Sequence, residues 1–385
     1  MGRFATRAAR SSSTDGRSGD TPLIHVIWGT KAEAIKVAPV LRELDRRGVS
    51  YRLVETGQHG AYLPVLRERL GIREPDVRLG GDADADTVVA AVRWALGLAG
   101  LLLSRRRLRS RVFGDRDGVC LVHGDTPSTL LATLMARRAG LPVAHLESGL
   151  RSGSFRHPFP EELIRVLVMR RAAVCFAPDA QAAGNLRSMG LKARIVETSG
   201  NTGLEALRDA LADVQPASGP VVATMHRVEN LHNRGRFDGF LALLGRLAGR
   251  GLEVRFVVHP PTDGVLARRG GRPAVEAGGV ATSDLVAYDE FVAMLAAAPF
   301  VITDGGSIQE ECARLGVPTL LWRDRTERPD GVGENVLVSR YEDDLVDGFL
   351  ADPESWRRPL RLGDERPASE VVDVLVDMMG GAGGT

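Results

Sequence analysis

The sequence contains few cysteines, almost no excess of charge and no long uninterrupted apolar run. Its three cysteines, Cys120, Cys175 and Cys312, are too far apart for a metal motif or a disulfide framework, which favours a reducing, cytoplasmic location. The 50 Lys and Arg residues almost balance the 49 Asp and Glu residues, for a formal net charge of +1. This balance disfavours a nucleic-acid partner held by bulk electrostatics.

Neither a secretory signal nor a membrane span is evident. Residues 1–21 are rich in Arg and Ser without an apolar centre, so we expect a disordered tail, with an organelle transit peptide left open. The most apolar segment, Thr87–Leu103, is interrupted by Arg93 and leaves about a dozen apolar residues, too few to cross a bilayer. We expect a buried helix there. The run SRRRLRSR at Ser104–Arg111 favours a solvated basic surface over contact with acidic lipids.

The glycine-rich phosphate-binding motifs are also missing. The stretch GTKAEAIKVAPVLREL begins at Gly29, directly after the apolar run PLIHVIW. It has neither the three spaced glycines of a dinucleotide fingerprint nor the Gly-Lys-Ser/Thr ending of a Walker loop. An anion bound at this helix start would therefore be held by backbone amides, Lys31 and Lys36.

The order of the apolar runs indicates two α/β domains. From Pro22 to about Ala177, short apolar runs alternate with longer helical segments, and a second such series follows the stretch RIVETSGNT. This rhythm is typical of parallel sheets covered by helices on both faces. We predict two doubly wound Rossmann-like domains with a cleft between them. They span residues 22–191, joined by a C-terminal helix at 369–379, and residues 194–364.

Eight polar loops follow predicted strands, on the edge where ligands bind in such sheets. They read GTK, TGQHG, HGDTPST, HLESGLRSG, MHRVEN, HPPTDG, DGGSIQEE and RDRTERPDG. In DGGSIQEE, Gly305 and Gly306 would let phosphates approach a helix start, and Glu311 would accept hydrogen bonds from ribose hydroxyls. The alternative is an ordinary helix cap by Asp304 or Ser307.

Three carboxylates form a second group of candidates. A lone loop acid is usually a cap or a salt-bridge partner, but Asp125 and Glu147 directly follow predicted buried strands, and Glu161 enters a helix after prolines. Several acids in one cleft suit proton transfer to and from a sugar carbon. His226 and Arg227 would neutralise a diphosphate leaving group, although His226 has an alternative as a packed structural side chain.

These residues carry a family resemblance. The motifs GTKAEAIKVAP, TGQHG, HGDTPSTL, HLESGLRSG, PFPEELIR, FAPDAQAAGNL, SGNTGLEAL, MHRVEN, DGGSIQEE and RDRTERP occur in the order of the non-hydrolysing UDP-N-acetylglucosamine 2-epimerases. The resemblance covers about residues 22 to 375. It implies a glycosyltransferase-B-like fold, a UDP-sugar in the interdomain cleft, and inversion at C2 to give UDP-N-acetylmannosamine without a cofactor or metal. A homodimer is compatible with it, although the sequence shows no interface.

The resemblance also implies roles for particular residues. Asp125, Glu147 and Glu161 would be acid/base groups, with His226 assisting. The residues expected to bind substrate are Lys31, Lys36, Asn201, Arg227, Gly305, Gly306, Ser307, Glu311 and Arg328. UDP would leave, the C2 proton would be removed, and UDP would return with a proton on the opposite face of C2.

Several departures from the family pattern bear on specificity. Lys31 stands where the family has Arg, Asp-Gly-Gly-Ser replaces Asp-Ser-Gly-Gly at Asp304, and the stretch after TGQH lacks the Arg-Glu of an activating second UDP-sugar site. HPPTDG likewise replaces His-x-Asn-Pro. These departures disfavour allosteric activation and leave the exact sugar open. The alternatives are a hydrolysing UDP-sugar 2-epimerase, a glycosyltransferase that uses a UDP-sugar donor, and a sensor that only binds one.

Overall fold

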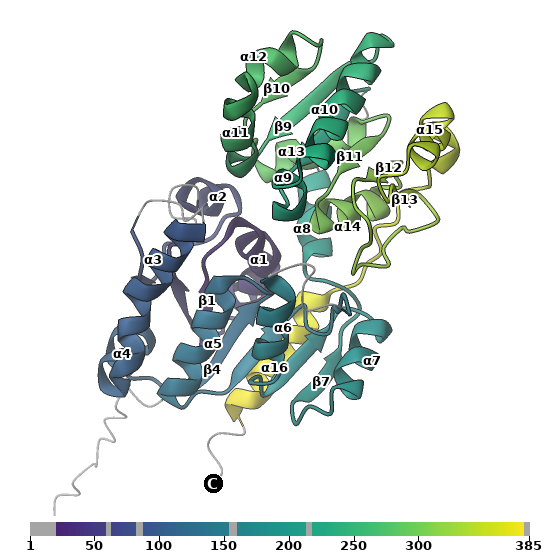
Figure 1. Ribbon diagram of the computed structural model, residues 1–385. Helices are drawn as coiled ribbons and strands as arrows, with labels where there is room; N and C mark the ends of the chain where they lie inside the picture. The colour runs from purple at the N-terminus through teal and green to yellow at the C-terminus, as the bar shows by residue number, and fades with distance from the viewer. Residues whose placement is uncertain (1–20, 59–62, 82–87, 154–159, 213–217, 381–385) are drawn as a thin grey trace, which may run out of the picture.

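The structure, a computed structural model, describes residues 21–58, 63–81, 88–153, 160–212 and 218–380. The expected tail at 1–21 therefore lies almost wholly outside the described residues. Two parallel β-sheets, each flanked by helices, form two lobes that Figure 1 shows one above the other. The predicted α/β class is confirmed.

The first sheet has seven parallel strands in the order β3-β2-β1-β4-β5-β6-β7. Its strands are β1 (Leu23–Trp28), β2 (Tyr51–Glu55), β3 (Val77–Arg78), β4 (Gly118–His123), β5 (Val143–Leu146), β6 (Val174–Ala177) and β7 (Arg194–Glu197). Its helices are α1 (Lys31–Arg46), α2 (Leu63–Arg69), α3 (Val88–Ala99), η1 (Gly100–Leu103), α4 (Arg105–Phe113), α5 (Pro127–Ala139), α6 (Glu161–Met169) and α7 (Ala180–Ser188). The central strands are buried on both faces, as their continuous apolar runs require.

The second sheet has six parallel strands in the order β10-β9-β8-β11-β12-β13. They are β8 (Val221–Met225), β9 (Val254–Val258), β10 (Ala281–Ser283), β11 (Val301–Thr303), β12 (Thr319–Leu321) and β13 (Val336–Val338). Its helices are α8 (Gly203–Leu211), α9 (Val228–Leu231), α10 (Arg234–Gly249), α11 (Pro260–Leu266), η2 (Ala267–Arg269), α12 (Gly271–Glu276), α13 (Tyr288–Ala297), α14 (Gly306–Leu315), α15 (Asp343–Ala351) and η3 (Pro353–Trp356).

Two elements bear on the predicted division of the chain. The strand β7 pairs in parallel with β6, with Val174 opposite Arg194, so Arg194–Glu197 extends the first sheet and does not open the second. The C-terminal helix α16 (Pro367–Gly380) packs its buried Val371, Val372 and Leu375 into the core of the first sheet. Figure 1 shows this helix, in yellow, beside the strands of the first lobe. That the two lobes are separate domains stays a prediction.

The apolar segment before the basic run differs from expectation. It forms α3 and then η1, and it leaves Leu96 and Leu103 exposed, so the prediction of a buried helix is wrong at these positions. The following helix α4 exposes Arg106, Arg107 and Arg111, as both a solvated basic surface and a contact with acidic lipids require. Within the described ranges, no helix is long and apolar enough to cross a membrane.

Candidate active site

The turn between β1 and α1 is held tightly by its own side chains. A Cβ atom on Gly29 would lie 2.0 Å from Thr56 Oγ1, so only glycine fits there. Thr30 caps α1, and the buried Glu33 carboxylate accepts hydrogen bonds from the amides of Gly29 at 2.5 Å and Thr30 at 3.3 Å. The amides of Gly29 and Thr30 are thus occupied within the chain and are not available to an anion.

Four charged side chains meet where the two sheets face each other. Lys36, from α1, pairs through Nζ with Glu147 and, at 3.3 Å, with Glu310 Oε2. Arg328 lies 2.8 Å from Glu310 Oε2 through Nη1 and 2.6 Å from Glu147 Oε1 through Nη2. We call Lys36, Glu147, Glu310 and Arg328 the charge ring. All four side chains are at least nine-tenths buried, so solvent screens these pairs weakly.

Glu147 is the centre of this arrangement. It follows β5 in the left-handed region at φ +55°, a conformation that a non-glycine residue rarely adopts. Asn201 donates a hydrogen bond to its carboxylate, and His123 Nε2 lies 3.5 Å from the same oxygen. Burial alone would raise the pKa of Glu147, but Arg328, Lys36 and His123 hold this pKa well below its ordinary range. The carboxylate is therefore ionised at neutral pH.

Asp125 and Glu161 form a second acidic pair with different surroundings. Arg165, one helical turn after Glu161 on α6, pairs with Asp125 and lies 2.9 Å from Glu162 Oε2. Among the described residues, the buried Oε2 of Glu161 has no hydrogen-bond partner. Burial and the nearby charge of Asp125 raise the pKa of Glu161, although Arg227 partly offsets this. Sequence reasoning missed Arg165, although its spacing from Glu161 places the two on one helix face.

Asp304 organises the loop that carries His226 and Arg227. Its fully buried carboxylate accepts hydrogen bonds from the amides of His226 and Arg227, each at 3.0 Å, and from Asn230 Nδ2 at 3.0 Å. It therefore ties the end of β8 to the end of β11 and does not cap α14, nor does Ser307.

The His226 ring stacks on His259 at 4.5 Å between centroids, and burial together with Arg227 and Arg323 lowers the pKa of His226 to about 4. The predicted neutralisation of a diphosphate thus falls to Arg227, because His226 is uncharged at neutral pH. Lys31 lies close enough to His259 to contribute to the lowered pKa of that ring.

The glycines of DGGSIQEE make room for charged neighbours. A Cβ atom on Gly305 would lie 3.0 Å from His226 Cε1, and one on Gly306 would lie 3.1 Å from Arg328 Nε. The helix α14 starts at this point without a side-chain cap. His226 and Arg328 thus lie beside the start of this helix, where backbone amides can bind an anion.

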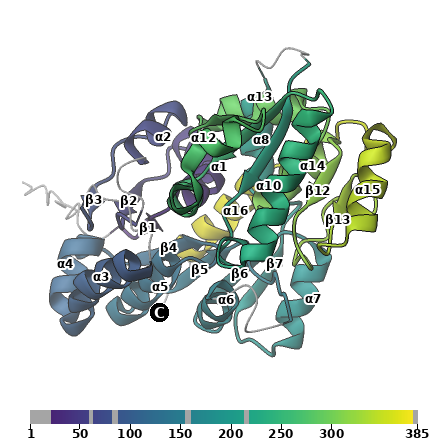
Figure 2. The same cartoon turned by 45° about the horizontal axis from the view of Figure 1, so that its top comes forward.

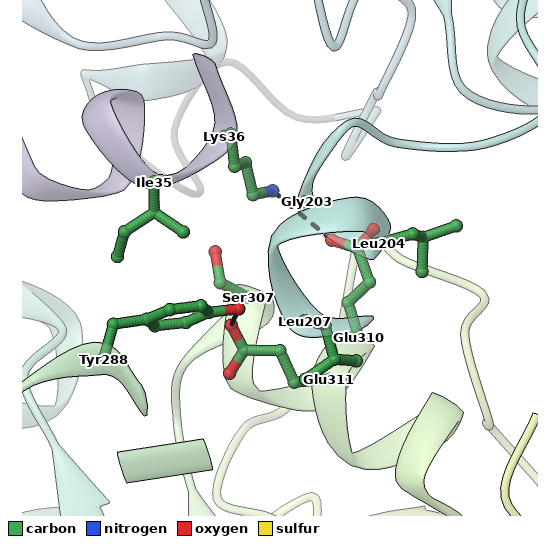
Figure 3. Close-up of a pocket in the computed structure, with 9 residues that line it drawn as sticks. All are labelled: Ile35, Lys36, Gly203, Leu204, Leu207, Tyr288, Ser307, Glu310 and Glu311. Carbon is green, nitrogen blue, oxygen red and sulfur yellow. Dashed lines mark hydrogen bonds and ion pairs between the residues drawn. The ribbon is translucent and has the colours of Figure 1, made fainter. Parts of the chain in front are cut away.

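A cavity opens beside the charge ring, between α1, α8, α13 and α14 (Figure 3). It is lined by Ile35, Lys36, Gly203, Leu204, Leu207, Tyr288, Ser307, Glu310 and Glu311. Figure 3 shows Lys36 directed at Glu310, and Tyr288 donates a hydrogen bond to Glu311 Oε1 at 3.1 Å. Apolar walls with a few carboxylate and hydroxyl groups are typical of a small-molecule site. Over the described part of the chain, no cluster of His, Cys, Asp and Glu is suited to hold a metal ion.

Glu311 gives this cavity a measurable pH dependence. Burial raises the pKa of its carboxyl from 4.5 to about 7. Between these values the folded chain holds a proton that the unfolded chain has lost, so the free energy of unfolding falls as pH rises. We expect Glu311→Gln to remove this contribution, so that the variant gains stability relative to the wild type between about pH 5 and about pH 7.5. Urea unfolding at the two pH values measures the effect, and an unchanged difference between the proteins would contradict it.

The comparison with known proteins agrees with this geometry. Residues 42–375 match the model of a family described as UDP-N-acetylglucosamine 2-epimerase. The chain belongs to the UDP-N-acetylglucosamine 2-epimerase family. It is 29% identical to the UDP-N-acetylglucosamine 2-epimerase of Bacillus subtilis over 92% of this chain and 94% of that protein. It is also 30% identical to the UDP-2,3-diacetamido-2,3-dideoxy-D-glucuronate 2-epimerase of Pseudomonas aeruginosa, over 84% of this chain and 90% of that protein.

A solved structure of the epimerase family supports the fold assignment. The UDP-N-acetylglucosamine 2-epimerase of Methanocaldococcus jannaschii, in complex with UDP-N-acetylglucosamine and UDP, superposes with a TM-score of 0.79 at 25% identity. The match covers 92% of this chain and 99% of that one. The predicted resemblance and glycosyltransferase-B-like fold are confirmed.

Proposed function

We propose that this epimerase-family chain inverts C2 of UDP-N-acetylglucosamine to give UDP-N-acetylmannosamine, by elimination and re-addition of UDP. The observation that carries the proposal is the opposite environment of two carboxyls, Glu147 and Glu161. Cations hold the pKa of Glu147 low, whereas burial raises the pKa of Glu161. Titratable groups whose pKa values are pushed apart are suited to act as a base and an acid in one reaction.

The order of events follows from the acidity of the substrate. The C2 proton is not beside a carbonyl group, so its direct removal is difficult. Departure of UDP first leaves positive charge at C1, and the C2 proton then becomes acidic enough for a carboxylate to accept. Return of UDP, with a proton delivered to the opposite face of C2, completes the inversion. The reaction requires two proton-transfer groups and a clamp for the departing diphosphate.

We assign the proton-transfer groups by their surroundings. Glu147 accepts the C2 proton, because it is ionised and fixed by Asn201, Lys36 and Arg328. Glu161 holds the proton that is delivered to the opposite face of C2. Asp125, paired with Arg165, supplies the negative charge that helps to keep Glu161 protonated.

The cations form the diphosphate clamp in this proposal. Lys36 and Arg328 lie beside the start of α14, where Gly306 and Ser307 present backbone amides. Arg227 adds a third positive charge on the side of His226. Glu311 accepts hydrogen bonds from the ribose hydroxyls. The diphosphate would replace the carboxylates of Glu147 and Glu310 as the partner of Lys36 and Arg328. The two cations would then no longer hold the pKa of Glu147 low. The base would thereby gain strength when the leaving group is in place.

Isotope incorporation tests the function directly. We expect pure protein incubated with UDP-N-acetylglucosamine in deuterated water to place deuterium at C2 of the intact nucleotide sugar, detected by proton NMR and mass spectrometry. Release of free N-acetylmannosamine would instead indicate the hydrolysing 2-epimerase. If no deuterium is incorporated in the absence of an acceptor, the glycosyltransferase and the sensor remain as the alternatives.

A second substrate merits the same assay. The Pseudomonas aeruginosa relative is named for UDP-2,3-diacetamido-2,3-dideoxy-D-glucuronate, and its identity to this chain equals that of the Bacillus subtilis relative within one percentage point. Comparison of kcat/KM for the two nucleotide sugars decides which sugar the site prefers. A cytoplasmic location and a homodimer stay predictions.

A further inference from the structure

The basic run of the sequence forms an exposed surface remote from the candidate active site. Arg106, Arg107 and Arg111 are exposed on α4, whose Leu108 and Val112 are buried. Figures 1 and 2 both place α3 and α4 at the outer margin of the first lobe, away from the second lobe. The charge ring and its cavity lie between the lobes, so a partner on α4 would leave them accessible.

Neighbouring arginines on α5 enlarge this surface. Arg137 and Arg138 are exposed at the end of α5, and Arg138 Nε donates to the carbonyl of Leu102 at 3.2 Å. Arg105 and Arg109 donate to the carbonyl of Ala139 at 3.3 Å and 3.2 Å, which fixes α4 against the end of α5. We call the exposed set the basic patch, and its members are Arg105, Arg106, Arg107, Arg111, Arg137 and Arg138.

The charges of the basic patch are not compensated within the described residues. There, the side chains of Arg106, Arg107 and Arg111 form no hydrogen bond or ion pair, and the ion pair of α4 with Asp117 belongs to Arg109. This concentration stands out in a chain whose formal net charge is only +1. A local field of one sign attracts a partner of the opposite sign.

Two exposed apolar side chains lie on the segments that lead into the basic patch. Leu103 is 84% exposed and Leu96 is 69% exposed, the highest values among large apolar side chains in the described ranges. Leu103 lies two residues before α4, and Leu96 lies two turns earlier along α3 and η1. Exposed leucines beside arginines are the combination that binds at the boundary of headgroups and acyl chains.

We propose that the basic patch docks on an anionic membrane surface, with its arginines against lipid phosphates and Leu103 inserted among the headgroups. A nucleic acid would match the charge but would gain nothing from the leucines. A second copy of this chain in a two-fold contact centred on the arginines would bring like charges face to face, which is unfavourable. An anionic bilayer fits both the charge and the apolar side chains.

Vesicle flotation tests the proposal with the full-length protein. Vesicles of equal parts phosphatidylglycerol and phosphatidylcholine should carry the protein upward, and vesicles of phosphatidylcholine alone should not. The triple variant Arg106→Glu, Arg107→Glu, Arg111→Glu should bind the anionic vesicles at least about a hundredfold more weakly, since each arginine contributes about 1 kcal/mol near such a surface. Leu103→Ser should weaken binding roughly tenfold, as expected for one buried leucine.

A matched variant controls for total charge. Arg250→Glu, Arg255→Glu and Arg268→Glu change the same number of exposed arginines in the second lobe and should leave vesicle binding unchanged. Circular dichroism confirms that each variant is folded. Equal loss of binding in this control, or equal binding to neutral vesicles, would overturn the proposal. The proposal would also be overturned if Leu103→Ser left vesicle binding unchanged and inorganic polyphosphate abolished that binding. The partner would then be a soluble polyanion.

Discussion

Glu147→Gln is expected to lower kcat by about 10²–10⁴-fold, the range for loss of a general base. The amide cannot accept the C2 proton, although it fills the same volume at the same left-handed backbone position. Binding of UDP should not weaken. The Glu147 carboxylate competes with a diphosphate for Lys36 and Arg328, so its neutralisation leaves both cations more available. Steady-state kinetics and calorimetric titration with UDP measure the two quantities separately.

The control is Glu147→Asp, which keeps the charge but withdraws the carboxylate by one methylene. It should retain more activity than Glu147→Gln. If Glu147 only anchors the loop after β5, then Glu147→Gln would lower the melting temperature while the folded protein turned over at the wild-type rate. That combination would remove Glu147 from the chemistry.

Lys36→Met is expected to lower turnover by roughly a hundredfold or more. Lys36 would hold the diphosphate as negative charge develops on the leaving oxygens, and loss of one such contact costs about 2–4 kcal/mol of barrier. The structure rules out a solvated lysine on the outer face of α1, because the side chain is 7% exposed and lies between Glu147 and Glu310. Removal of one member of a buried ion pair should also destabilise the fold, by about 3–5 kcal/mol.

A second variant separates these two effects. Lys36→Met combined with Glu310→Gln removes one positive and one negative charge, so the charge ring keeps its balance around Arg328 and Glu147. We expect urea unfolding to show stability largely recovered while turnover stays low. Recovery of turnover along with stability would show that Lys36 acts only in the fold.

Strands and several helices could be predicted from the sequence where a run of neighbouring residues determines the element. The run PLIHVIW became β1 at Leu23–Trp28, because a strand buried on both faces must be continuously apolar. The predicted second domain begins at Arg194, whereas β7 pairs with β6 of the first sheet; its four residues are partly exposed and have no apolar pattern that specifies a partner. The prediction of a buried helix from apolar composition was also wrong at Leu96 and Leu103, because an apolar side chain does not reveal whether another element covers it.

The sequence predicted which residues form the candidate site, but not which of them form ion pairs with one another. The motifs located Lys36, Glu147 and Arg328, yet the ion pairs among them join residues 111 and 181 positions apart. Such pairing depends on how the two sheets are placed, which no local pattern contains. The same holds for Asp304, whose sequence position suggested a helix cap and whose carboxylate instead holds the loop of His226 and Arg227.

The charge ring has a consequence for how ligand enters and leaves. Glu147 and Glu310 together carry as many negative charges as the diphosphate of a nucleotide sugar, and they contact the same two cations. The protein thus contains an internal substitute for its own leaving group. When a diphosphate takes the place of these carboxylates beside Lys36 and Arg328, neither cation is left unpaired in a buried site. Lys36 and Arg328 therefore avoid, in both the free and the ligand-bound protein, the large desolvation penalty that a bare buried charge would impose.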